Sequence, residues 1–375
     1  MNECLKGVDA QEKVVVGLSG GIDSAVAATL LVQQGFKVEG VTLKVWESED
    51  GTREATKKWQ ERSCCKIGIA RFVTEQLGIT HHVVDVKSEF RKAVINDFID
   101  GYVAGQTPNP CVRCNERIKF TQLYEVAQSL QADYVATGHY VQLVRDLITD
   151  ELHLARATDH SKDQTYFLHR LRKDWLPHLM FPLGGLKKAD VWTIAESLGL
   201  PVDEISESQE ICFVTQSSYR EFLESEVSEI RRPGNIVDPS GCVVGQHQGV
   251  FNYTRGQRRG LGVATGERVF VLEVEPQTDT VVVGPEEQLF RSDCLVGDLN
   301  LHCSTKVLFE KPVMGKIRYG MTAAPAVVKP HSVNIVHVIF ETAQRAITPG
   351  QSAVFYRGDQ VLGGGIIINS KGGLS

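Results

Sequence analysis

The sequence lacks the features of several specialised protein classes. No apolar run among its 375 residues approaches the roughly 20 residues of a membrane-spanning helix, so we expect no membrane partner. Residues 1–13 carry charges without an apolar core, which excludes a secretory signal. The nine cysteines are odd in number and irregularly spaced, which argues against a disulfide scaffold and for reduced thiols in the cytoplasm. Internal repeats and low-complexity tracts are absent as well.

The composition is that of an ordinary soluble protein, with 42% hydrophobic and 23% charged residues. A chain of this length predicts two or three domains. The net charge of −6 argues against a broad nucleic-acid coat. Residues 231–260, however, hold five arginines and a single acidic residue, Asp238. This basic segment fits either selective contact with a structured RNA or a solvated loop.

The first half of the chain alternates predicted strands and helices. We expect strands at Lys13–Leu18, Lys37–Lys44, His81–Val86 and Tyr134–Thr137, and helices at Asp23–Gln34, Lys66–Leu77, Phe90–Ala104, Ile118–Gln131 and Lys187–Leu198. This order predicts an α/β fold with a doubly wound parallel sheet that binds ligands at the carboxyl ends of its strands.

After about Val214, short strands separated by glycine turns replace the helical pattern. The segments Arg268–Val274 and Val281–Gly284 predict a hairpin. Further strands are expected at Lys316–Tyr319, Asn334–Phe340, Ser352–Tyr356 and Gly365–Ile368. We therefore predict three domains: a catalytic domain at residues 1–216, a small mixed central domain at 217–284, and a C-terminal β-barrel at 285–375. The charged segment Glu47–Arg62 is expected to be a surface loop.

A β-branched run, Val14–Val16, leads into Gly-Leu-Ser-Gly-Gly-Ile-Asp-Ser at residues 17–24, and a helical pattern follows. A strand, a glycine turn and a helix N-terminus together form an anion site, because backbone N–H groups converge there. The lysine of a Walker A loop is absent, and so is Gly-x-Gly-x-x-Gly. The loop instead resembles that of the ATP pyrophosphatases, which bind pyrophosphate while AMP is transferred to the substrate.

Two segments carry cysteines in informative settings. In Thr107–Asn115 the prolines Pro108 and Pro110 predict an extended loop that presents Cys111 and Cys114. Their Cys-x-x-Cys spacing fits a redox pair, a zinc half-site or an iron–sulfur half-site, and structural zinc is disfavoured because no second pair follows. Cys212, in Ser206–Phe213, fits either a buried apolar residue or a thiol at the exit of a polar loop.

Together, several motifs resemble the tRNA-specific 2-thiouridylases over essentially the whole chain. They are Ser19–Ser24, Thr107–Asn115, Thr137–Tyr140, Lys162–Gln164, Ser208–Phe213, Arg232–Gly234, Thr254–Arg258, Lys316–Tyr319 and Leu362–Gly365. The resemblance implies a fold like that of the adenine nucleotide alpha hydrolases. It also implies a sulfurtransferase that replaces the C2 oxygen of the wobble uridine of tRNA with sulfur, giving 2-thiouridine, AMP and pyrophosphate.

The resemblance assigns an ATP site and two catalytic thiols. ATP with Mg²⁺ is expected at Gly17, Leu18, Ser19, Gly20, Gly21, Ile22, Asp23, Ser24, Leu43 and Gly138. Cys212 matches the cysteine that carries a persulfide, and Cys114 matches the nucleophile that attacks it or resolves the resulting disulfide. Since thiolate attack requires a lowered pKa, we expect Arg113 and Arg117 to supply positive charge.

A set of tRNA contacts is carried over in the same way, with the basic segment adding two arginines. It comprises Asn109, Pro110, Cys111, His139, Lys162, Asp163, Gln164, Arg255, Arg258, Arg318, Tyr319 and Gln351. The substrates implied are tRNAs for Glu, Gln and Lys. The expected sulfur donor is a cysteine desulfurase, acting directly or through a relay protein, and the enzyme is expected to be a cytoplasmic monomer.

Cys111 departs from the pattern, because many members of the family have Asp there. Two interpretations stay open. In one, Cys111 contacts the target base in a pocket shaped by Asn109 and Pro110. In the other, Cys111, Cys114 and Cys212 hold a [4Fe–4S] cluster with one open iron that binds the incoming sulfide.

Three alternatives to tRNA thiolation remain. The first is another ATP pyrophosphatase that adenylates a small molecule, which would leave the cysteines unexplained. The second is a thiol redox protein, and the third is an RNA-binding module without catalysis. The intact Ser19, Asp23 and Ser24 argue against both of the latter.

Overall fold

The computed structural model describes residues 12–46, 67–146, 150–200, 202, 211–214, 218–227, 230–263 and 266–369. The chain divides into two compact units. The first contains Met1–Val94, Cys111–Phe213 and Asp359–Val361, and the second contains Ile95–Pro110, Val214–Gly358 and Leu362–Ser375. The segment Glu47–Arg62 and the cysteines Cys4, Cys64 and Cys65 lie outside the described residues.

A five-stranded parallel sheet forms the centre of the first unit, in the order β3-β2-β1-β4-β7. Its strands are β1 (Lys13–Gly17), β2 (Lys37–Lys44), β3 (Thr80–Asp85), β4 (Tyr134–Ala136) and β7 (Leu179–Met180). Val14, Val15 and Val16 of β1 are fully buried. Since successive side chains of a strand point to opposite faces, both faces of the sheet are covered. This confirms the predicted doubly wound fold; β7, only two residues long, gave no sequence signal.

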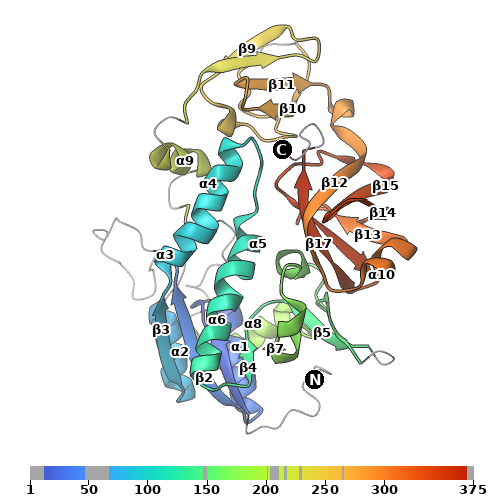
Figure 1. Cartoon of the computed structure of the whole chain (residues 1–375). Coiled ribbons are helices and arrows are strands. Elements are labelled where there is room, and N and C mark those ends of the chain that lie inside the picture. Colours follow the sequence, from blue (N-terminus) through green and yellow to red (C-terminus); the bar gives the residue numbers. More distant parts are fainter. Residues whose placement is uncertain are drawn as a thin grey trace. The chain divides into compact units, whose positions relative to one another are not determined.

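The first unit also contains helices. They are α1 (Ile22–Gln33), α2 (Ile67–Leu77), α3 (Lys87–Phe90), α5 (Pro110–Cys114), α6 (Phe120–Ser129), α7 (Thr165–Leu168) and α8 (Lys188–Ser197), with the π-helical turns η2 (Arg91–Ile95) and η3 (Asn115–Lys119) and the 3-10 helix η4 (Lys173–His178). Of these, α1, α2 and α6 pack directly on the sheet. Val26 of α1 packs in one core with Val73 of α2 and Val191 of α8. Figure 1 shows α2 and α6 alongside the strands.

A short antiparallel hairpin, β5 (Val141–Arg145) and β6 (Leu152–Arg156), completes the first unit. Gln360, at the start of β17, pairs with Ala155 of β6. The backbone N–H of Arg156 donates to the carbonyl of Asp359 at 2.9 Å. The sequence analysis did not identify this hairpin.

The second unit begins with α4 (Asn96–Val103), α9 (Tyr219–Glu226) and a four-stranded mixed sheet in the order β10-β11-β8-β9. The strands are β8 (Gly234–Val237), β9 (Val243–His247), β10 (Phe270–Glu275) and β11 (Thr280–Gly284), and η6 (Val250–Asn252) precedes β10. The antiparallel pairing of β10 with β11 confirms the predicted hairpin. Tyr102 of α4 stacks on Tyr219 of α9, with ring centroids 5.0 Å apart.

A closed antiparallel barrel forms the rest of the second unit, as predicted. It contains β12 (Phe290–Leu301), β13 (Val313–Lys316), β14 (Ala324–Ser332), β15 (Ile335–Arg345), β16 (Ser352–Arg357) and β17 (Gln360–Ile368), with η7 (Glu286–Leu289) and α10 (Thr305–Glu310) in its connections. The pairing of β12 with β17 closes it, which leaves no exposed sheet edge there. Cys294 lies in its core, where burial raises the thiol pKa to about 12. The predicted strand at Lys316–Tyr319 is wrong, because β13 ends at Lys316.

No helix in the described part of the chain is long and apolar enough to cross a membrane.

Candidate functional site

The loop from Gly17 to Ser24, called the phosphate loop below, joins the end of β1 to the start of α1. Gly20 adopts a φ of 73°, a conformation that favours glycine. Gly21 is the N-cap of α1, and no side chain caps this helix end. The first amide groups of α1 therefore keep hydrogen-bonding capacity for an anion, which the positive end of the helix also favours.

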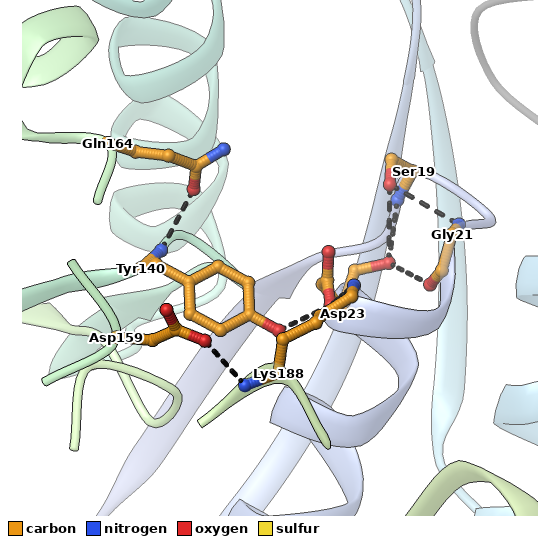
Figure 2. Close-up of polar contacts among 8 residues, drawn as sticks. Ser19, Gly21, Asp23, Tyr140, Asp159, Gln164 and Lys188 are labelled. Carbon is orange, nitrogen blue, oxygen red and sulfur yellow. Dashed lines mark hydrogen bonds and ion pairs between the residues drawn. The ribbon is translucent and has the colours of Figure 1, made fainter. Parts of the chain in front are cut away.

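The phosphate loop is held in shape by its own serines (Figure 2). The Ser24 hydroxyl donates to the carbonyl of Gly21 at 2.9 Å and accepts from the backbone N–H of Ser19 at 3.2 Å. The two hydroxyl groups of Ser19 and Ser24 lie 3.3 Å apart. These bonds fix the loop without a ligand, so the anion site is largely formed by the fold itself.

Gly138 follows β4 and lies against the first turn of α1. A Cβ atom at this position would lie 2.6 Å from the backbone carbon of Asp23 and 2.7 Å from the backbone nitrogen of Ser24. Backbone atoms cannot move aside as a flexible side chain can, so only glycine fits. The structure thus brings Gly138 to the phosphate loop, whereas Leu43 is a buried residue of β2.

Two residues that the sequence analysis did not assign to the site complete this region. The Tyr140 hydroxyl donates to Asp23 Oδ1 at 2.8 Å, and Lys188 Nζ lies 2.6 Å from the same oxygen. Figure 2 shows Tyr140 extending from Gln164, which contacts its backbone, to Asp23, which contacts its hydroxyl. Lys188 lies 165 residues from Asp23, so no spacing in the sequence indicates the contact.

Two residues predicted to contact tRNA, Gln164 and Asp163, form hydrogen bonds within the protein in the same region. The Gln164 side chain accepts the backbone N–H of Tyr140 at 2.8 Å. Asp163 is buried, and its carboxylate accepts the Thr165 hydroxyl at 2.7 Å and the backbone N–H of Ala157 at 3.3 Å. These bonds shape the turn that carries Lys162, which is half-buried.

His139 lies between Gly138 and Tyr140 with its Nδ1 2.8 Å from the Thr137 hydroxyl. Desolvation of the imidazole, helped by the positive charge of Lys119, lowers the pKa of His139 to about 3. The ring is therefore neutral at physiological pH, even though part of the residue surface remains accessible. Any contact that it makes with RNA is a hydrogen bond or a stacking contact rather than an ion pair.

The expected extended loop is wrong from Pro110 onward, because Pro110–Cys114 forms the helix α5, whereas Thr107–Asn109 lie outside any helix or strand. Proline is tolerated at the first position of a helix, where no backbone N–H is needed and its φ is already helical. Cys111 and Cys114 are three residues apart and therefore lie on one face, with Cys111 exposed and Cys114 buried.

The two arginines predicted to supply positive charge to the thiols have a carboxylate partner. Arg113 lies 3.0 Å from Glu116, and Arg117 lies 3.8 Å from it, so the two arginines are engaged by a carboxylate. The buried Arg170 contacts the other oxygen of Glu116 at 2.8 Å. Lys119 is a cation that acts on Cys111.

Desolvation raises the pKa of the Cys111 thiol above its ordinary value, although the residue keeps an exposed surface. Lys119 acts in the opposite direction, and the neighbouring thiol of Cys212 raises the pKa further. The last effect shows that Cys111 and Cys212, 101 positions apart in the numbering, lie within electrostatic range of each other.

Cys212 is exposed, so the interpretation of this residue as a buried apolar side chain is wrong. The adjacent Phe213 is buried and packs edge-on against Phe90, with ring centroids 5.8 Å apart. The phenylalanine thus anchors the segment and leaves the thiol outside. Residues 203–210, including most of the polar stretch before Cys212, lie outside the described residues.

No group of three histidine, cysteine or acidic side chains converges as metal ligands within the described ranges. Cys111, Cys114 and Cys212 are thiols rather than disulfide partners. Their arrangement therefore does not fit the three-cysteine cluster in this structure.

Comparison with known proteins identifies the family. The sequence profiles of three domains match in chain order: the tRNA methyl transferase HUP domain at residues 12–216, the tRNA methyl transferase PRC-barrel domain at 220–285 and the aminomethyltransferase beta-barrel domain at 291–367. The tRNA-specific 2-thiouridylase MnmA of Clostridium perfringens is 43% identical over 95% of this chain and 98% of its own. The chain belongs to the tRNA-specific 2-thiouridylase family.

Other relatives agree with this result. The 2-thiouridylase of Acetivibrio thermocellus is 42% identical over 96% of this chain and 99% of its own length. Among solved structures, the NMN synthetase of Francisella tularensis is 19% identical over 58% of this chain and 77% of its own, with a TM-score of 0.33. A TM-score this low supports no inference about function.

In this 2-thiouridylase, further candidate tRNA contacts lie in the second unit. The Gln351 side chain donates to the carbonyl of Thr107 at 2.6 Å, and the carbonyl of Pro349 accepts the backbone N–H of Thr107 at 2.9 Å. The barrel loop around Gln351 thus holds the segment that carries Asn109 and Pro110. Arg318, the next of the set, donates to the Thr348 hydroxyl at 3.1 Å in the same loop.

The remaining members of the set differ in exposure. Tyr319 is 39% exposed, and the Lys316 ammonium lies 5.3 Å from its ring centroid. Arg258 is exposed, whereas Arg255 is half-buried. Desolvation and the nearby positive charge of Arg291 lower the pKa of Arg255 to about 10. The exposed Arg258 is therefore better placed for a phosphate contact than Arg255.

Proposed function

We propose that this enzyme replaces the C2 oxygen of the wobble uridine in tRNA with sulfur at the expense of ATP. Membership of the 2-thiouridylase family along 95% of the chain carries this assignment. ATP-dependent thiolation of tRNA uridine follows from that membership, and the chain is accordingly a tRNA sulfurtransferase. The position of the modified uridine and the roles of single residues are our proposals.

The phosphate loop supports the first step. The uridine C2 oxygen attacks the α-phosphorus of ATP, pyrophosphate leaves, and the adenylated oxygen becomes a good leaving group. The amide groups at the start of α1 bind the pyrophosphate, and Gly138 allows the loop after β4 to approach them. Mg²⁺ bound to the phosphate oxygens would neutralise the charge that develops on them.

The thiols support the second step. The terminal sulfur of a persulfide on Cys212 attacks C2, and AMP leaves. The Cys114 thiolate then attacks Sγ of Cys212, which releases the thiolated base and forms a Cys114–Cys212 disulfide. Alternatively, Cys114 attacks first and releases hydrosulfide, which adds to C2. Both orders leave the same disulfide, which an external thiol reductant must reduce before the next turnover.

We also propose a role for Cys111. Since its thiol is exposed and within electrostatic range of Cys212, we assign it to the pocket of the target base together with Asn109 and Pro110. Our proposed mechanism uses no iron–sulfur cluster, because the described cysteines do not converge as metal ligands. Iron and sulfide analysis of anaerobically purified protein tests this choice.

The partners remain as the sequence predicts. We propose tRNAs for Glu, Gln and Lys as substrates, a cysteine desulfurase or relay protein as the donor, and a monomeric enzyme in the cytoplasm. The division at residues 216 and 284 is proposed as well. Members of the predicted set of tRNA contacts that are buried or hydrogen-bonded within the protein would act indirectly, by shaping the surface that binds RNA. The proposed RNA contacts are His139, Lys162, Asp163, Gln164, Arg255, Arg258, Arg318, Tyr319 and Gln351.

One reconstituted reaction tests the proposal. Purified enzyme, Mg·ATP, cysteine, a cysteine desulfurase and unmodified tRNA should give 2-thiouridine, AMP and pyrophosphate in equal amounts, measured by mass spectrometry and nucleotide chromatography. Omission of ATP should abolish the product. AMP formed without tRNA would instead indicate adenylation of a small molecule. Product formed only by iron-containing protein, and lost in Cys111→Ser, would establish the cluster mechanism in place of the persulfide.

A further inference from the structure

Lys188 is a buried lysine whose ammonium group lies beside the phosphate loop. It is the first residue of α8, and only 8% of its surface is exposed. Its backbone N–H donates to Asp159 Oδ2 at 3.0 Å, which fixes the start of α8 (Figure 2). A buried ammonium group persists only where other groups offset its lost hydration, so its surroundings are specific.

Among the described residues, three side chains contribute to those surroundings. Asp23 Oδ1 lies 2.6 Å from Lys188 Nζ. The centroids of the Tyr140 and Trp192 rings lie 5.6 and 5.2 Å from the ammonium nitrogen, within the range of cation–π attraction. The Tyr140 hydroxyl also donates to Asp23 Oδ1. Two donors from distant parts of the chain thus converge on one carboxylate oxygen.

This carboxylate is in an unusual place for an anion-binding loop. Asp23 is the second residue of α1, next to the amide groups that would receive the phosphates. Residues 17–24 contain no lysine or arginine, so the loop itself supplies no compensating cation. Without a neutralising partner, the negative charge of the Asp23 carboxylate would repel the polyphosphate, because like charges close together repel strongly.

We propose that Lys188 is a positioning residue of the nucleotide site, which neutralises Asp23 and holds its carboxylate against Tyr140 so that the phosphate loop accepts ATP. The proposal rests on the proposed function, because that function makes ATP the ligand. Lys188 acts through Asp23 in this account and does not touch the phosphates. The cation that a Walker A loop carries within itself is here supplied indirectly from α8.

The direct test measures binding of Mg·ATP to the full-length protein by calorimetry without tRNA. Lys188→Gln should weaken binding roughly tenfold, the effect of losing one charge-assisted contact. Lys187→Gln is the matched control, since Lys187 is the exposed preceding residue, and it should leave binding unchanged. Lys188→Arg should restore most of the affinity. The affinity for tRNA should be the same in all three variants.

A double-mutant cycle separates the indirect role from direct contact. In an Asp23→Asn background, where no carboxylate needs neutralising, Lys188→Gln should change ATP affinity less than twofold. An equal loss in both backgrounds would show that Lys188 binds the phosphates itself and would overturn the proposal. Unchanged affinity in a folded Lys188→Gln protein would overturn it too.

A second variant decides the question if Lys188→Gln does not fold. Tyr140→Phe removes one of the two donors to Asp23 and keeps the ring, so a two- to threefold loss of ATP affinity is expected. Unchanged affinity would contradict the proposal. Thiolation of tRNA by the wild-type protein is assayed in parallel. A protein that binds ATP but does not thiolate tRNA would refute the proposed function. The ATP affinities of the variants would still decide the role of Lys188.

Discussion

The phosphate loop and the thiol helix α5 belong to the same reaction but are constructed differently. Hydrogen bonds between Ser19, Gly21 and Ser24 hold the phosphate loop, so its donors are in place before a ligand arrives. The thiol helix carries reactive groups whose state depends on neighbours: Lys119 lowers the pKa of Cys111, while desolvation raises it. The backbone amide groups of the anion site are positioned by local hydrogen bonds, whereas the ionisation of a thiol depends on charges and burial contributed by the surrounding fold.

The largest expected effect concerns the thiols. Cys212→Ser and Cys114→Ser should each lower the single-turnover thiolation rate by more than about 1,000-fold, the scale on which loss of a nucleophile acts. Because the phosphate loop is formed independently, binding of ATP and tRNA should persist, as measured by calorimetry and filter binding. Product at the normal rate from either variant would remove that cysteine from the mechanism.

The next effect tests the loop itself. Gly138→Ala places a Cβ 2.6 Å from the Asp23 backbone, so we expect the unfolding free energy to fall by about 1–3 kcal/mol and ATP affinity to fall with it. Gly320→Ala is the control, since nothing lies within 4 Å of its Cβ. Calorimetry and denaturant unfolding measure both quantities. Normal ATP binding by Gly138→Ala would contradict the assigned close approach.

A smaller effect tests the activation of the thiol helix. Lys119→Met removes the charge that lowers the Cys111 pKa, so less thiolate forms and alkylation by iodoacetamide at pH 8 should slow about two- to fivefold. Mass spectrometry of the Cys111 peptide measures the rate. Arg117→Met should have no such effect, because Arg117 faces Glu116. A larger effect of Arg117→Met than of Lys119→Met would contradict the role given to Lys119.

A further expected effect is a pH dependence of stability. His139 has a pKa of about 3 in the folded protein, below its ordinary value of 6.5, so the unfolded chain binds a proton that the folded chain does not. Its contribution to stability is complete above pH 6.5 and is lost as the pH falls toward 3. Between pH 6.5 and 4.5 the unfolding free energy should therefore fall less steeply in His139→Gln. Identical slopes would show that the ring is already hydrated in the fold.

The sequence predicted most of the α/β architecture because hydrophobic period and chain order are local properties. The run Val14–Val16 indicated a buried strand, and glycines at 17, 20 and 21 indicated the turn that follows. The error at Pro110 arose from treating proline only as a helix breaker, although it starts α5. Strand β7 was missed because it has only two residues and pairs with β4, which lies far back in the sequence. The hairpin of β5 and β6 was missed although its two strands are neighbours in the sequence.

By itself, the sequence determined the phosphate loop, the cysteines at 111, 114 and 212, and the family to which they belong. Backbone conformation and residue identity are enough for these features, since the turn and the thiols are local. Only the tertiary structure decided that Lys188 pairs with Asp23 and that Lys119 acts on Cys111. Electrostatic interactions depend on distance and burial, and neither is set until the chain has folded.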